Sequence, residues 1–100
     1  MRPAPWLLYH YPVNLLAHRI VDIVLQEGAR FSRSGAEGGR ERVATVLTEV
    51  LTSRGMDPEA VSIDDFRLFF HDGWQDLLDR VCPSDTHTRV NERFYHLVFS

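Results

Sequence analysis

The chain has no lysine and a single cysteine, Cys82, among its 100 residues. A P-loop is excluded, because that motif needs a lysine to reach the phosphates of a nucleotide. An intrachain disulfide is excluded too, which fits a reducing compartment. We expect Cys82 to be a small buried hydrophobic side chain rather than a reactive thiol.

Clustered positive charge is also missing. The formal net charge is −3 with neutral histidines, and no block of basic residues occurs. This argues against nucleic-acid binding as the main function, because phosphate contacts need clustered cations.

Residues 1–13 contain three prolines and no long apolar run, so we expect neither a signal peptide nor a membrane span there. Proline does not fit a helix interior, which predicts an extended arm. The arm carries Trp6, Tyr9 and Tyr11, and it either covers its own domain or docks on a partner. Residues 14–100 are predicted to form a single helical domain. We expect the protein to be nuclear if its source is eukaryotic and cytoplasmic otherwise.

Apolar residues recur with helical spacing along this domain, which predicts an all-α fold of about five short helices. Asn14 is expected to cap the first, which runs to about Glu27 and ends at a left-handed Gly28. Residues 29–39 are small and polar, which predicts a flexible linker. The second helix is expected from about 40 to 54, with Gly55 closing it.

Ser62 is a good N-cap, and Asp64 and Asp65 follow it where the helix dipole favours negative charge. This predicts a third helix over 62–70. A fourth is expected over 74–81, with Pro83 after its end. Ser84 or Asp85 is expected to cap a fifth, and no strand-type alternation of useful length appears.

No group of residues points to catalysis. The five histidines lack the i, i+4 spacing of a helical metal site, and the acidic pairs Asp64/Asp65 and Asp76/Asp79 are typical of solvated helix faces. No nucleophile lies next to a base. We therefore predict a protein that is not an enzyme and has no catalytic residue, metal site or cofactor.

The predicted helices are short, and several have wide apolar faces. Such faces can bury one another in a self-sufficient bundle, or they can close around a partner helix in an open arrangement. Under the second hypothesis, the partner-binding residues are Leu16, Ile20, Val24, Val43, Leu47, Leu51, Phe66 and Phe70.

The order of these signals resembles that of the enhancer-of-yellow or Sus-type adaptor family. In that family a leucine-rich first helix ends at glycine. A second amphipathic helix and its glycine then precede a V-[ST]-[VI]-D-D-L-like segment. A glycine break, a short helix reaching "V-P-D" and a last amphipathic helix follow. The similar positions here are Leu16 to Gly28, Val43 to Gly55, Val61 to Phe66, Gly73, Leu77 to Val81, Pro83 with Asp85, and Val90 to Val98.

The resemblance implies a non-enzymatic adaptor whose helices clasp one long helix of a scaffold protein. The partners it implies belong to the SAGA deubiquitinating module or to a nuclear mRNA-export complex, with no direct nucleic-acid contact and no membrane.

Two alternatives of other classes remain open. One is a small helical DNA-associated regulator with a basic edge, and the other is an acidic immunity-type protein that binds a basic toxin. The basic edge would consist of Arg19, Arg30, Arg33, Arg40 and Arg42.

Overall fold

The computed structural model describes residues 14–28 and 35–100, so the predicted arm (1–13) and residues 29–34 of the predicted linker lie outside it. Within the described residues the chain forms α-helices and one 3-10 turn and no strand, which confirms the all-α prediction of about five helices. The helices are α1 (Leu15–Glu27), α2 (Gly35–Ser53), α3 (Ile63–His71), α4 (Trp74–Val81) and α5 (His87–Phe99), with the 3-10 turn η2 (Ser84–Thr86) before α5.

Asn14 caps α1 as predicted, and it also ties α1 to the loop before α3. Its Oδ1 accepts from the amide of Ala17 at 3.0 Å. Its Nδ2 donates to the carbonyl oxygen of Val61 at 3.1 Å, 47 positions away in the chain. Because the side chain is almost fully buried, its amide oxygen and its amide nitrogen both need hydrogen-bond partners, and these two bonds supply them.

Gly28 ends α1, but the predicted left-handed conformation is wrong, since its φ is −121°. The residue is constrained by space instead. A Cβ atom at this position would lie 2.5 Å from Cys82 Sγ and 2.9 Å from a methyl group of Val90. Glycine therefore lets the end of α1 approach the segment that joins α4 to α5.

The prediction of a linker as far as residue 39 is wrong, because α2 already begins at Gly35. Two contacts with α1 hold the second turn of α2. Gly39 packs against Leu25, so that a Cβ atom at position 39 would lie 3.4 Å from a methyl group of Leu25. Arg40 forms an ion pair with Asp22. Packing on α1 thus overrides the low helix propensity of glycine. At the other end Gly55 has a φ of +75°, which confirms the predicted left-handed residue.

Ser62 and Asp65 form a capping box at the start of α3, which confirms the predicted N-cap. The Ser62 hydroxyl accepts from the Asp65 amide, and the Asp65 carboxylate accepts from the Ser62 amide, each at 3.1 Å. The prediction for the fifth helix is wrong in detail. Ser84 and Asp85 lie in η2, and Thr86 precedes α5 without a side-chain cap.

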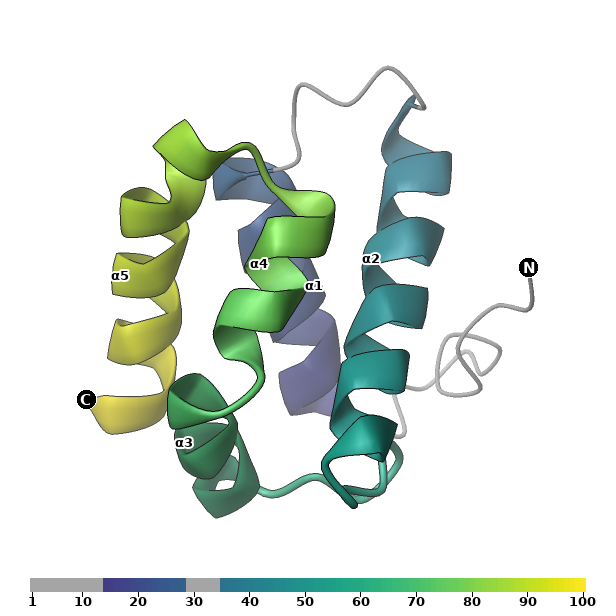
Figure 1. Ribbon diagram of the computed structural model, residues 1–100, viewed down its shortest axis with the longest axis vertical. Coiled ribbons are helices and arrows are strands. Elements are labelled where there is room, and N and C mark those ends of the chain that lie inside the picture. The colour runs from purple at the N-terminus through teal and green to yellow at the C-terminus, as the bar shows by residue number, and fades with distance from the viewer. Residues whose placement is uncertain (1–13, 29–34) are drawn as a thin grey trace.

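The helices surround one core (Figure 1). In that view α2 and α5 stand on either side, α1 lies behind, α4 lies in front, and α3 packs below α4 and α5. The radius of gyration of the Cα atoms is 12.3 Å, close to the ~13 Å typical of a closed 100-residue domain. The expected open arrangement is therefore wrong, because the apolar faces bury one another.

The largest fully buried side chains come from all five helices. They are Trp74, Phe66, Phe69, Phe94, Ile20, Leu47, Leu51, Leu77, Leu78, Val21 and Val24. Among the described helices, none combines the length and apolar character that a membrane crossing requires.

Candidate functional site

Six of the eight predicted partner-binding residues lie in the core of the chain itself. Ile20, Val24, Val43, Leu47, Leu51 and Phe66 expose 2% of their surface or less. Leu16 and Phe70 are partly buried and pack against the same core. Contact of these residues with a partner stays a prediction, and for the six buried ones it would require the helices to separate.

The acidic residues considered for acid–base chemistry all have structural partners. Asp65 belongs to the capping box, and Asp64 pairs with Arg67 at 2.9 Å. Asp76 lies 3.5 Å from an Arg54 nitrogen, and Asp79 accepts from Gln75. These contacts hold helix ends and helix surfaces in place.

Cys82 is buried, as predicted. Burial raises the pKa of its thiol from 9.0 to about 11, with a hydrogen bond involving Thr86 acting in the opposite direction. Because the thiolate is the nucleophilic form, this environment suppresses the reactivity of Cys82 at neutral pH.

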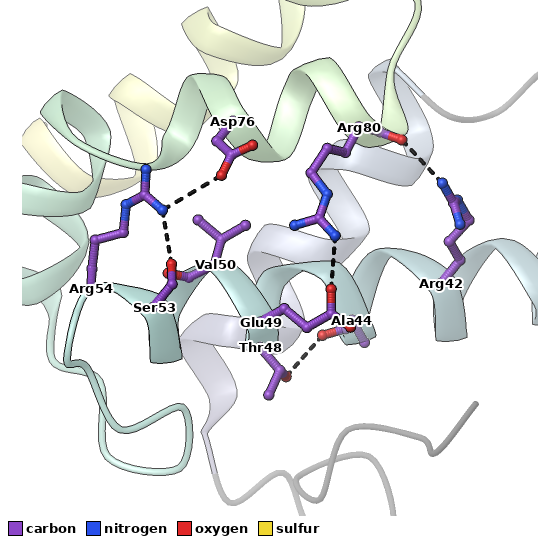
Figure 2. Close-up of polar contacts among 9 residues, drawn as sticks. All are labelled: Arg42, Ala44, Thr48, Glu49, Val50, Ser53, Arg54, Asp76 and Arg80. Atoms are coloured by element: carbon purple, nitrogen blue, oxygen red, sulfur yellow. Dashed lines mark hydrogen bonds and ion pairs between the residues drawn. The ribbon is translucent and has the colours of Figure 1, made fainter.

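A row of charged contacts joins α2 to α4 (Figure 2). Arg54 reaches the carboxylate of Asp76, and Arg80 binds Glu49 at 2.8 Å. Arg42 donates to the backbone carbonyl of Arg80 at 3.3 Å. The row occupies the exposed margin of the interface between these helices, where such pairs contribute at most about 1 kcal/mol each. We interpret these contacts as structural, since they hold α2 and α4 together at the surface.

The predicted basic edge is not assembled by the described residues. Arg40 faces α1 and pairs with Asp22, whereas Arg42 faces α4. Arg19 lines a groove between α1 and α5. Arg30 and Arg33 lie outside the described residues.

A cluster of aromatic side chains lies at the surface of α3 and α5. We define the α3/α5 aromatic surface as Phe70, His71, Tyr95 and Phe99. Tyr95 and Phe99 are one turn apart on α5, with ring centroids 4.7 Å apart and planes at 24°. The ring of Phe70 packs within 6 Å of both, and His71 packs on Phe99. Tyr95 is 49% exposed although it is large and largely apolar.

Arg67 fixes the position of this surface. Its Nε donates to the carbonyl oxygen of Val98 at 2.6 Å, in the last turn of α5, where carbonyls lack helical partners. Its guanidinium also lies 6.0 Å from the centre of the Phe99 ring. One side chain on α3 therefore holds both the backbone and an aromatic ring of α5.

Tyr95 and Phe99 were not among the predicted site residues, although the sequence carries a signal for them. The helical pattern of α5 was assigned from Val90, Phe94, Leu97 and Val98, of which Leu97 is partly buried and the other three are buried. Tyr95 and Phe99 form a second i, i+4 pair on another face of the same helix. A second apolar face of this kind is a sequence signal for a surface beyond the core.

The described residues contain no group of three or more histidine, cysteine, aspartate or glutamate side chains that could hold a metal ion. Comparisons of the chain with protein-family models, curated proteins and solved structures found no match. The resemblance to the enhancer-of-yellow or Sus-type family therefore stays a prediction.

Proposed function

We propose that the chain is a non-enzymatic adaptor and that a helix of a protein partner docks on its α3/α5 aromatic surface. The observation that carries this proposal is the half-exposed stack of Tyr95 on Phe99, with Phe70 beside it. Such aromatic side chains dominate the energetics of protein interfaces.

The chemistry of the surface suits an amphipathic helix. The rings of Tyr95 and Phe99 extend one turn along α5, and Phe70 adds apolar area from α3. A partner helix would place apolar side chains on these rings at i, i+3 or i+4 spacing. Arg67 and His71 at the margin would supply the polar rim of such an interface.

The absence of enzymatic activity is part of the proposal. Burial raises the pKa of the Cys82 thiol, and this direction opposes nucleophilic chemistry. The family resemblance adds the class of assembly, namely a transcription coactivator such as the SAGA deubiquitinating module, or a nuclear mRNA-export complex. In such an assembly the adaptor would stabilise and position other subunits.

Site-specific photocrosslinking tests the proposal. A photoreactive phenylalanine analogue replaces Tyr95 in the full chain, and a matched chain carries it at Leu15. Leu15 is 61% exposed and lies at the start of α1, outside the aromatic surface. Adducts formed in the cells that express the protein are identified by mass spectrometry, and the crosslinked partner segment is mapped.

We expect one partner to be captured at position 95 and not at position 15, through a segment with helical apolar spacing. His71→Glu should reduce that adduct while leaving the circular dichroism spectrum unchanged. Capture of the same proteins from both positions, capture of only a second copy of the chain, or absence of any adduct would each overturn the proposal.

A further inference from the structure

A groove runs between α1 and α5, on the side of α5 away from the aromatic surface. Its two parts have volumes of about 410 and 210 Å³ and share Arg19, Ile23 and Arg93. The larger part also contains His96, Leu97 and Ser100. The groove thus has a mostly polar and cationic lining, to which the partly buried Leu97 adds an apolar side chain.

The groove has positive local charge on a chain whose net charge is negative. Glu27 is shared by Arg93 at 2.9 Å and Arg89 at 3.8 Å, and Asp22 is paired with Arg40. Among the described residues, Arg19 has no ion-pair partner. The groove lining itself contains two arginines, Arg19 and Arg93, and one carboxylate, Asp22, on a chain with a formal net charge of −3.

We propose that this groove binds an acidic, amphipathic segment of a protein partner. An apolar side chain of the segment would pack on Leu97, while its carboxylates would pair with Arg19 and Arg93. The groove volume suits a short stretch of side chains. This inference rests on other observations than the aromatic surface does, and it would give an adaptor two binding faces on α5, which meet where His96 packs against Tyr95.

A protein segment fits the groove better than a nucleic acid does. Nucleic-acid binding needs a run of cations that follows successive phosphates. Here the two arginines of the lining are interspersed with the carboxylate of Asp22 and the apolar side chain of Leu97.

The test is a fluorescence-anisotropy titration of the full chain with a labelled acidic peptide. The peptide spans about four helical turns and carries leucine at every third or fourth position, with glutamates between. A matched peptide has glutamine in place of each glutamate, and a single-stranded oligonucleotide serves as the polyanion probe. The protein variants are Arg19→Glu, Arg93→Gln and Glu27→Gln. Arg42→Glu, on the α2–α4 side, is the control for charge reversal.

We expect the acidic peptide to bind, with affinity that falls as salt is raised. Arg19→Glu and Arg93→Gln should each weaken binding by about fivefold, the size of a partly exposed charge pair. Glu27→Gln should strengthen binding because it releases Arg93. Arg42→Glu should leave affinity within about twofold of the original chain.

Three results would overturn the inference. The first is no binding of the acidic peptide at millimolar concentration, and the second is equal binding of the glutamine peptide. The third is tighter, Arg19-dependent binding of the oligonucleotide, which would assign the groove to nucleic acid. A peptide that docks on the aromatic surface instead would bind Arg19→Glu and Arg93→Gln as tightly as the original chain, so these variants separate the two proposals.

Discussion

Gly28 and Cys82 approach so closely that a Cβ atom at position 28 would stand 2.5 Å from the Cys82 sulfur. Real Cβ atoms are essentially never that close to a neighbour, so the end of α1 and the end of α4 can meet only through glycine. Val90 of α5 lies within 2.9 Å of the same point. The ends of α1 and α4 therefore meet α5 at position 28, where the glycine has no side chain.

Gly28→Ala should destabilise the fold, because the added methyl group overpacks this point. We expect a loss of about 1–3 kcal/mol in the free energy of unfolding, measured by urea denaturation. Gly55→Ala is a useful comparison. Nothing lies within 4 Å of its added Cβ, so any cost there comes from the φ of +75° alone.

A double-mutant cycle isolates the contact itself. Cys82→Ala removes the sulfur that the new methyl group would meet, so it should recover part of the loss caused by Gly28→Ala. Strictly additive effects of the two substitutions would contradict this explanation and place the cost elsewhere.

The Cys82 thiol should react slowly with a disulfide reagent at pH 8. Its pKa of about 11 leaves little thiolate, and its side chain is buried. Labelling should accelerate sharply in denaturing urea, where the thiol regains an ordinary pKa. Rapid stoichiometric labelling of the folded chain would contradict the buried position.

The same shift predicts a pH dependence of stability. The folded-state pKa lies above its ordinary value, so the contribution of the buried thiol is fully present below about pH 9. It should decline as pH rises through about 11. Cys82→Ser should flatten this part of the curve of unfolding free energy against pH.

Asn14→Asp should destabilise the protein, although aspartate is as good an N-cap as asparagine. The carboxylate keeps the acceptor for Ala17 but removes the donor to Val61, and it faces carbonyl oxygens in a buried position. We expect a loss of about 1–3 kcal/mol in urea denaturation. Ser62→Asp also places a carboxylate at an N-cap, but this cap is exposed, so the loss of unfolding free energy should be much smaller.

Leu47→Ala should cost about 2–5 kcal/mol, because the side chain is fully buried. Leu47→Asp should unfold the chain, so loss of partner binding in that variant would not identify an interface. The matched comparison is Leu68→Ala. Leu68 is 64% exposed, so its substitution should change the free energy of unfolding by less than about 0.5 kcal/mol. Thermal melts followed by circular dichroism measure both.

The helices that were predicted well begin at local signals. Asn14 and Ser62 cap α1 and α3 through side-chain bonds to amides three residues on, and this chemistry is visible in the sequence. The glycine-rich segment 35–39 was predicted to be a linker but is helical, and Gly39 and Arg40 there contact Leu25 and Asp22 of α1. Contacts between helices have no local signature.

The candidate site was less predictable than the fold. Helical spacing identifies an apolar face, but it does not say whether that face is covered by the same chain or by a partner. Leu47 and Leu51 would be buried in either case, and here the chain itself covers them. Tyr95 was not predicted, because the sequence analysis assigned α5 a single apolar face, the one that contains Phe94.

The bond from Asn14 to Val61 also bears on the order of events during synthesis. The two residues are 47 positions apart. At about 5–20 residues per second, α1 leaves the ribosome several seconds before the carbonyl that accepts from its capping side chain. The apolar face of α1 also packs on α5, the last helix to be made, so it stays partly uncovered, and open to chaperones, until α5 has emerged.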